Sequence, residues 1–398
     1  MKKLAVLTGA VLISAALAGA ADWPQFRGPN ANGISPESGL NTNWAQKKPE
    51  QLWKVTLGDD GFSGPAVAHG KVFVVDHDQN QDIVRALDIA SGKEAWRYAY
   101  EESGGANYGF NRATPCINDG MVYTVSMKGV INCLAEADGK VIWQKKMADF
   151  GGRSPAWAFA CSPIVDGENV ILVPGGQGSS VVAVNRKTGA LIWKSGTDQP
   201  GYSTPVVATI NGVKQYVVFS ATSVNGYAAD SGKKLWSFPW KTSYDVNTAA
   251  PIVMGDTVFI SSGYEVGCAL LEIAPEGAKE VWKNKAIQLH FSSPVLIDGR
   301  IYSTTDNGDL VCLDPKTGSD IWRQKAKFEK GGLVAADGVL YVMSGADGRL
   351  VLVQATPDAY KELSQMTPLG GQSWTAPIIA DGKVIVRNKQ AMVCLNLK

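Results

Sequence analysis

The segment from Asp76 to Asp82 has the spacing of a metal-binding loop. It reads DHDQNQD and carries oxygen side chains at alternate positions, namely Asp76, Asp78, Asn80 and Asp82. Alternating Asp and Asn residues of this kind form the first half of a calcium loop. However, Gln81 stands where that loop requires glycine, and Leu87 stands where a bidentate glutamate belongs. The segment is a weak calcium candidate, and a solvated hairpin loop is the interpretation we prefer.

The six cysteines do not form a reactive pair, because no two of them are adjacent. Three of them precede a leucine in the same slot of a repeat, namely Cys133, Cys312 and Cys394. A shared slot indicates a small buried position, so we expect buried thiols. An exported chain also permits disulfides, and Cys116 and Cys161 are the pair to test.

The remaining reactive residue types give no catalytic constellation. The three histidines lie in different repeats and lack the spacing of a zinc site. We find no nucleophile elbow, phosphate-binding loop or spaced histidine-cysteine cluster. We therefore lean toward a protein that is not an enzyme.

Aromatic side chains are the remaining candidates for binding. They occur three residues before several prolines and in the long irregular segments 101–112, 149–160 and 240–248. Long loops on a rigid scaffold commonly carry function. We predict that one mouth of a central funnel, a ligand or partner site, is lined by Phe62, Tyr108, Phe110, Arg112, Arg153, Trp157, Tyr202, Tyr244, Asp245, His290, Phe291 and Trp374. The alternative is that these rings pack under the N-terminal segment or cap the strands beside them.

A repeated four-strand unit must position these loops. Residues 292–322 contain four short β-rich runs separated by turns at Asp298-Gly299, Asn307-Gly308 and 315–318. Glycine supplies the positive φ that such hairpin turns need. The segment is therefore predicted to form a four-stranded antiparallel meander.

The unit recurs along the chain at spacings of 40 to 50 residues. Its last strand carries a tryptophan at Trp53, Trp96, Trp143, Trp193, Trp236, Trp282 and Trp322. Its first strand follows Pro65, Pro115, Pro163, Pro205, Pro251, Pro294 and Pro377, and Gly332 stands at the eighth opening. Each tryptophan would bury about 150 to 250 Å² between neighbouring units. The repeat predicts an all-β fold, an eight-bladed β-propeller of four-stranded antiparallel blades docked by these tryptophans.

The ring is predicted to close through an N-terminal strand. The last unit begins at Pro377 and supplies only three runs before Lys398. Residues 52–57 precede the first unit, so we predict that they form the missing fourth strand of the last blade. Closure in this way leaves no long exposed edge, and the propeller comprises residues 52–398.

Two segments precede the propeller. Residues 1–20 have the pattern of a secretory signal peptide, with Lys2-Lys3, a short apolar run and Ala18-Gly19-Ala20. Residues 21–51 form an arm that we expect to be ordered, because Trp23, Phe26 and Trp44 are costly to leave in water. No cysteine near the cleavage point offers a lipid-anchor site. We expect a periplasmic or secreted monomer without a transmembrane segment.

Charge gives no reason to expect a nucleic-acid partner. The 38 Lys and Arg residues nearly balance 37 Asp and Glu residues, for a net charge of +1. Such a chain has no field that attracts nucleic acid or an anionic membrane. Partners must be recognised by shape, and we expect a protein partner in the cell envelope.

The repeat motifs resemble a known family. The segments from Ala86-Leu87-Asp88 to Trp96 and from Cys312-Leu313-Asp314 to Trp322 resemble the tryptophan-docking repeats of the pyrroloquinoline quinone (PQQ)-type propellers. That family includes quinoprotein alcohol dehydrogenases and the outer-membrane protein assembly factor BamB. The resemblance covers the chain from Trp53 onward, and WPQFRGP at residues 23–29 resembles the lead-in of exported members.

The resemblance implies two different functions. The dehydrogenases hold PQQ and calcium with an adjacent cysteine pair and a catalytic aspartate; this chain lacks the cysteine pair and is shorter. We therefore expect an exported, non-catalytic binding or scaffold propeller of the BamB type, without a cofactor, that assists outer-membrane protein assembly. The alternatives are a PQQ-dependent oxidoreductase of the alcohol dehydrogenase type and a polysaccharide-binding propeller, since stacked aromatic rings around a polar mouth suit sugar rings.

Overall fold

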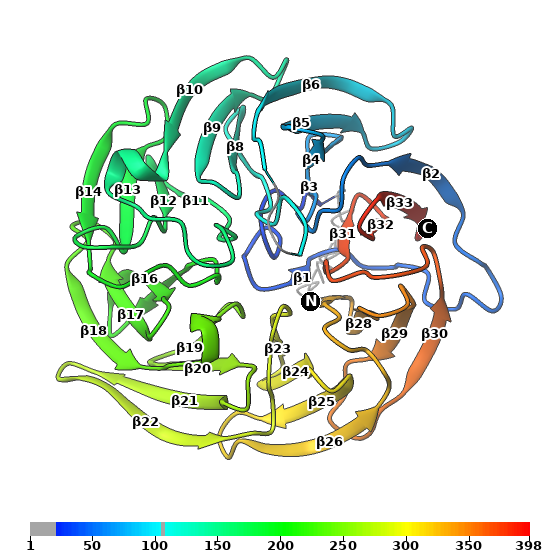
Figure 1. The fold of residues 1–398 in the computed structure, drawn as a ribbon. Coiled ribbons are helices and arrows are strands. Elements are labelled where there is room, and N and C mark those ends of the chain that lie inside the picture. Colours follow the sequence, from blue (N-terminus) through cyan, green and yellow to red (C-terminus); the bar gives the residue numbers. More distant parts are fainter. Residues whose placement is uncertain (1–20, 105–107) are drawn as a thin grey trace, which may run out of the picture.

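The chain forms a closed ring of eight antiparallel sheets around a central axis (Figure 1). The computed structural model describes residues 21–104 and 108–398, so the predicted signal peptide lies outside the described residues. Each blade contributes four consecutive antiparallel strands, and the last blade is completed from the N-terminal side. The predicted eight-bladed β-propeller is confirmed.

The strands follow the predicted repeat. Blades one to four consist of β3 (Ala66–Ala68), β4 (Lys71–Asp78), β5 (Gln81–Asp88) and β6 (Glu94–Glu101); β7 (Cys116–Asn118), β8 (Met121–Val125), β9 (Val130–Ala135) and β10 (Val141–Lys146); β11 (Ile164–Asp166), β12 (Asn169–Leu172), β13 (Val181–Asn185) and β14 (Leu191–Ser195); β15 (Val206–Ile210), β16 (Val213–Phe219), β17 (Ser223–Ala228) and β18 (Lys234–Pro239). Two short 3₁₀ helices, η1 (Met147–Phe150) and η2 (Ser243–Asp245), lie in loops between blades.

The second half of the ring repeats the same order. Blades five to eight consist of β19 (Ile252–Met254), β20 (Thr257–Ser262), β21 (Gly267–Ala274) and β22 (Gly277–Asn284); β23 (Val295–Ile297), β24 (Arg300–Thr304), β25 (Asp309–Asp314) and β26 (Ser319–Lys325); β27 (Leu333–Ala336), β28 (Val339–Met343), β29 (Leu350–Gln354) and β30 (Glu362–Met366); β31 (Ile378–Ala380), β32 (Lys383–Arg387), β33 (Ala391–Asn396) and β2 (Gln51–Thr56).

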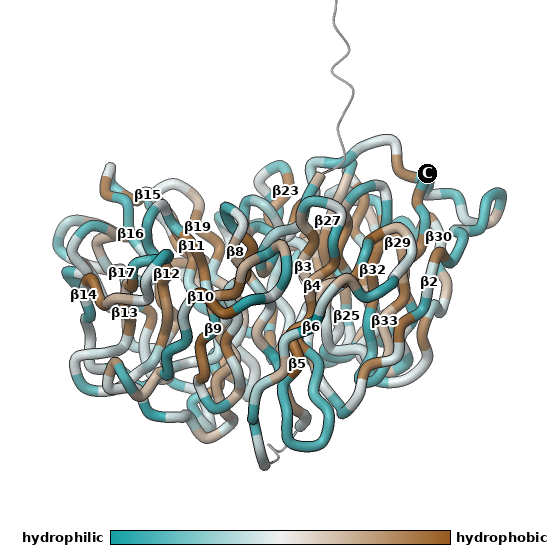
Figure 2. The backbone as a smooth tube through the Cα atoms, turned by 90° about the horizontal axis from the view of Figure 1, so that it is seen from above, coloured by the Kyte–Doolittle hydropathy of each residue, from teal (hydrophilic) through white to brown (hydrophobic). Residues whose placement is uncertain are grey.

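Burial changes from the axis outward. The innermost strand β3 buries all of its residues, whereas the outermost strand β6 alternates exposed side chains with partly buried ones and buries only Tyr100. The inner strands of each blade carry apolar residues on both faces of the sheet, because each face packs against a neighbouring blade. The side view shows hydrophobic stretches along the strands and mainly hydrophilic loops at both faces (Figure 2).

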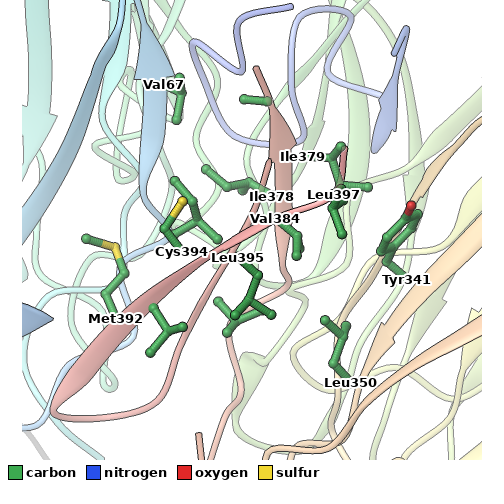
Figure 3. Packing of buried hydrophobic residues seen from close by; sticks show 14 of the residues in the cluster. Val67, Tyr341, Leu350, Ile378, Ile379, Val384, Met392, Cys394, Leu395 and Leu397 are labelled. Carbon is green, nitrogen blue, oxygen red and sulfur yellow. The ribbon is translucent and has the colours of Figure 1, made fainter. Parts of the chain in front are cut away.

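The ring closes as predicted. Strand β2 pairs antiparallel with β33, with Trp53 opposite Cys394. The closing blade packs between its neighbours, since Ile378, Val384 and Leu395 share one apolar cluster with Val67 of blade one and Tyr341 of blade seven (Figure 3). Strand β2 begins at Gln51, one residue before the predicted boundary.

The repeated tryptophans form a belt near the outer edge of the ring. A β-bulge precedes the tryptophan slot in each blade, as between Val141 and Trp143, and turns the indole toward the next blade. Five of the indole N–H groups donate to a backbone oxygen of the following blade: Trp53 to Ile89, Trp96 to Glu136, Trp143 to Arg186, Trp282 to Pro315 and Trp322 to Thr356, at 2.8 to 2.9 Å. These residues therefore dock neighbouring blades.

Two belt tryptophans differ from the others. Trp236 donates within its own blade to Gln215 Oε1 at 2.6 Å. Trp193 packs against the turn at Gly232 of the next blade, but its N–H finds no partner among the described residues. Trp193 therefore lacks the stabilisation that the other belt tryptophans gain from an indole hydrogen bond.

The arm fills the eighth belt slot and crosses the axis. Blade seven has Ser364 opposite Leu352, where other blades carry tryptophan. The arm places Trp44 there, with its backbone N–H donating to Ser364 Oγ at 3.0 Å. Closer to the N-terminus of the arm, β1 (Ile34–Ser35) pairs parallel with β27, and Trp23 exchanges two hydrogen bonds with Val67. Figure 1 shows this segment passing over the centre of the ring.

All six cysteines are buried as free thiols. Cys116 and Cys161, the pair considered for a disulfide, belong to apolar clusters between different blades. Burial raises the pKa of each of these two thiols to about 12. The expectation of buried thiols is confirmed, and the thiolate form that reacts is disfavoured.

Candidate functional site

A central funnel of about 540 Å³ runs along the axis, in the size range of small-molecule pockets. The residues that precede the innermost strands form its mouth, as Phe62 and Trp374 show. The arm bonds to the middle and far ends of those strands, through Val67, Ile117 and the turn at Asp381. The arm therefore closes the end opposite the mouth, with Trp23, Phe26 and Arg27 in the lining.

Eight rings form what we call the aromatic collar: Phe62, Tyr108, Trp157, Tyr244, Tyr264, His290, Phe291 and Trp374. Neighbouring rings touch in sequence around the mouth, with centroids 4.2 to 6.4 Å apart: Phe62–Trp374, Trp374–Phe291, Phe291–His290, His290–Tyr264, Tyr264–Tyr244, Tyr244–Trp157 and Trp157–Tyr108. Gly109, the neighbour of Tyr108, lies beside Phe62, so the two ends of the series come near each other. Each such pair contributes about 0.5 to 1.5 kcal/mol.

The collar is held in an unusual backbone conformation. Tyr108, Tyr244 and Tyr264 have φ values of 69°, 65° and 57°. Bulky residues rarely adopt this left-handed region, and such strain concentrates at binding and catalytic sites. Tyr108 and Tyr244 are also 65% and 67% exposed. Large exposed rings in a strained backbone are a feature that blade packing does not explain.

Burial favours the neutral form of two collar residues, His290 and Tyr264. Burial and the nearby Lys330 lower the pKa of His290 to about 4. Burial raises the pKa of Tyr264. The Tyr264 hydroxyl and His290 Nε2 lie 2.7 Å apart and share a hydrogen bond. The pair can orient a ligand, and it adds no charge to the mouth.

Three cationic side chains supply the charge of the funnel. At the mouth, the Lys330 ammonium lies over the Phe291 and Trp374 rings at 5.5 and 5.3 Å. Arg112 donates to the backbone oxygens of Trp157 and Gly109. Arg27 lies at the closed end. No Asp or Glu occurs among the described residues that line the funnel, so the charged side chains of the lining are all cationic; Asp306 lies beside Lys330 but outside the lining.

The structure brings together nine of the twelve residues predicted for the mouth: Phe62, Tyr108, Arg112, Trp157, Tyr202, Tyr244, His290, Phe291 and Trp374 line the funnel. The other three lie elsewhere. Phe110 stacks on the buried His77 with ring centroids 3.6 Å apart. Arg153 and Asp245 are exposed and do not line the cavity. The role of these residues in binding stays a prediction.

Several site residues were missed from the sequence. Tyr264 lies in the loop between β20 and β21, which emerges on the same face as the other loops. Lys330 precedes Gly332 at the one opening without proline. Arg387, which is buried, donates to the backbone oxygens of Gly61 and Ser63 and so fixes Phe62 between them. Tyr264 and Lys330 could have been found from the sequence by including every loop that emerges on the face of the mouth.

The calcium candidate is not assembled into a metal site. Asp76 accepts hydrogen bonds from Gly58 and His77 backbone N–H groups and pairs with Arg85. Asp82 is buried and bonded to His77, Asn111 and Tyr100. Asp78 and Asn80 are exposed on the β4–β5 hairpin. Among residues 21–104 and 108–398, no group of three or more His, Cys, Asp or Glu residues could hold a metal ion.

Fold and belt together define an eight-bladed propeller whose blades are docked by tryptophans. The family model for the outer membrane protein assembly factor BamB matches residues 37–114, 80–324 and 311–398. The chain therefore belongs to the BamB family. In the described part of the chain, no helix is long and apolar enough to cross a membrane.

Individual relatives agree with the family match. The outer membrane protein assembly factor BamB of Yersinia pestis is 25% identical over 357 residues, which cover 86% of this chain and 76% of that protein. The crystal structure of BamB from Moraxella catarrhalis has a TM-score of 0.64 at 14% identity, covering 87% of this chain and 99% of that one. A europium-containing methanol dehydrogenase has a TM-score of 0.70 at 15% identity, covering 94% and 89%. At these identities the two structures show a shared fold alone.

The funnel does not fit PQQ held by calcium. Calcium takes oxygen ligands, most often carboxylates, and no carboxylate lies in the described lining. Three cations occupy the mouth and the closed end instead. All six cysteines are buried as free thiols, and no two of them are adjacent in the sequence. This lining favours an anionic or apolar occupant over a metal-bound cofactor.

Proposed function

We propose that this chain is an exported, non-catalytic propeller that binds a protein partner in the cell envelope and assists outer-membrane protein assembly, as its relatives are named for doing. It acts without a resident cofactor. The aromatic collar is the binding surface, because exposed rings in a strained backbone at a cavity mouth are typical of recognition sites. The unbroken series of ring contacts that runs from Phe62 through Phe291 to Tyr108 is the observation that carries the proposal.

The collar suits a protein partner for a second reason. Aromatic residues with a basic neighbour are enriched among the anchors of protein interfaces. Lys330 and Arg112 supply the basic neighbours here. The rings already pack on one another, so little side-chain entropy is lost when a partner binds.

Co-purification from envelope extracts tests this function. A tagged chain is expected to retain an identified component of the outer-membrane assembly machinery, whereas the collar variant Tyr244→Ser with Phe291→Ser loses it. The control is Ile142→Ser with Leu191→Ser, which removes apolar side chains that are 46% and 47% exposed on outer strands. Equal retention by the collar variant would contradict the proposal, as would cofactor-dependent alcohol oxidation by the wild type.

A further inference from the structure

The funnel is a blind cavity. Its mouth is open at the collar, and the arm closes its far end with Trp23, Phe26 and Arg27. A polypeptide cannot pass through such a cavity. A volume of about 540 Å³ accommodates a single short segment rather than a folded domain. A partner chain that enters must therefore either turn back or end inside the cavity, and so small a volume favours a free end.

The charge of the lining selects which end enters. The described lining contains Arg27, Arg112 and Lys330 and no carboxylate. A terminal ammonium would be repelled by these cations and would find no carboxylate in the described lining, since the nearby Asp306 lies beside Lys330 and outside it. A terminal carboxylate would be attracted at the mouth and again at the closed end.

Arg27 is arranged to receive an anion at the closed end. Its Nε donates to Ala31 O at 3.2 Å, and its Nη2 donates to Asn32 O and to Pro294 O at 2.8 and 2.6 Å. These bonds fix the guanidinium plane. Nη1 donates to no described residue, and Arg27 forms no ion pair with any of them. Burial without a carboxylate lowers the pKa of Arg27 to about 10, which leaves the group charged at neutral pH.

The walls between these cations are apolar and hydroxyl-bearing. Phe62, Phe291 and Trp374 offer ring surface near the mouth. Deeper in, hydroxyls from neighbouring blades line the cavity, and Thr114 N–H donates to Ser162 Oγ at 2.9 Å. An apolar side chain fits against the rings, and a peptide backbone can bond to the hydroxyls.

We propose that the funnel binds the carboxyl terminus of the partner polypeptide, with the terminal carboxylate at Arg27 and an apolar side chain inside the collar. The inference rests on the proposed function, since it names the part of the protein partner that the collar receives. Charge-assisted hydrogen bonds from a guanidinium to a carboxylate supply the discrimination.

The test uses the mature chain, residues 21–398, and two fluorescein-labelled pentapeptides followed by anisotropy. Both have the sequence Gly-Ser-Gly-Val-Leu; one ends in a free carboxylate and the other in an amide. We expect the free acid to bind at least about tenfold more tightly than the amide, because hydrogen bonds to charged groups contribute about 1.5 to 3 kcal/mol. Added salt should weaken the acid more than the amide.

Three variants locate the effect. Arg27→Gln is expected to weaken acid binding about tenfold and to leave the amide unchanged. Lys330→Met, which leaves the arm intact, should weaken acid binding about threefold through the loss of one partly exposed charge. Lys187→Gln removes an exposed cation on a turn outside the funnel and should change neither peptide.

Several outcomes would overturn the inference. Equal binding of acid and amide, no binding of either, or acid binding unaffected by both Arg27→Gln and Lys330→Met would each do so. Displacement of the peptide by phenylacetate at a similar concentration would assign the site to small organic acids instead. If the collar variant still loses its envelope partner in any of these cases, the proposed function stands while this inference fails.

Discussion

The belt and the collar use the same residue types for opposite purposes. Belt residue Trp143 is 7% exposed, bonds to Arg186 O of the next blade and sits beside a bulge that every blade repeats. Collar residue Tyr244 is 67% exposed, contacts other rings and has φ of 65°. The belt rings hold the blades together, whereas the collar rings are held in place by the blades. Exposure, backbone conformation and bonding to the next blade therefore separate a structural aromatic residue from a candidate binding residue.

The belt should dominate stability. Trp143→Ala is expected to lower the free energy of unfolding by about 3 to 5 kcal/mol, because it opens a cavity between blades two and three. Trp193→Ala should cost about 1 kcal/mol less, since its N–H has no partner to lose among residues 21–104 and 108–398. Chemical denaturation of both variants measures the difference. Equal losses would show that the inter-blade hydrogen bond contributes nothing.

The turn glycines that face the belt should be the next most sensitive positions. Gly139 has φ of 74°, and a Cβ there would lie 2.6 Å from Trp96 Cε3. Gly139→Ala combines left-handed strain of about 1 kcal/mol with overpacking of about 1 to 3 kcal/mol.

Gly120→Ala is the matched control in the same blade. Gly120 has φ of 73°, and a Cβ there would meet nothing within 4 Å. Its cost should be the strain of about 1 kcal/mol alone. Thermal unfolding of the two variants isolates the contact with Trp96, and similar melting temperatures would contradict the docking role of that ring.

The collar should show its effect in pH dependence. Burial raises the pKa of Asp306, beside Gly263 and Lys330, to about 6. Because the folded state holds this proton more tightly than the unfolded state, ionised Asp306 costs stability above pH 6 and costs none below about pH 4. Asp306→Asn should therefore be more stable than wild type by about 1 to 2 kcal/mol at pH 7, after allowance for partial exposure.

The neighbouring His290 acts in the opposite direction. Its pKa is lowered to about 4, so wild type loses stability as the pH falls from about 6.5 to 4. The advantage of Asp306→Asn should disappear near pH 4, and the variant should lose stability more steeply than wild type on the way down. Urea denaturation at several pH values measures both. A constant difference between the two proteins from pH 7 to 4 would show that Asp306 keeps an ordinary pKa.

The smallest effect on stability is expected at the exposed rings. Tyr244→Ala should lower the free energy of unfolding by about 1 kcal/mol, the low end of what its two ring pairs contribute, because the side chain buries little surface. It also releases no left-handed strain, since alanine is strained at that position as well. A larger loss of stability would mean that Tyr244 holds the fold together, as the belt tryptophans do.

Sequence reasoning reached the fold because the repeat constrains each blade in the same way. The tryptophan slot, the turn glycines and the missing last strand together determined the ring and its closure through β2. It did not reveal that Trp44 of the arm fills the eighth belt slot beside Ser364. That contact joins segments 320 residues apart, and no local pattern records it.

The site was predicted less completely for a physical reason. The funnel residues that stand three positions before the opening proline of a blade were identified because that position recurs from blade to blade. Phe110 was misplaced because its stacking on His77 depends on the buried bonds of His77 to Asp82. Arg27 was missed because only the path of the arm across the axis brings it under the funnel.

Photocrosslinking in living cells tests the central claim most directly. A photoreactive phenylalanine analogue is placed at position 291 in the collar or at position 142 on the outer edge of β10, and adducts are identified after irradiation. The account predicts an adduct with an outer-membrane assembly protein from position 291 and none from position 142. An adduct from position 142 alone would contradict it, because the partner would then dock on a blade edge and leave the collar unoccupied.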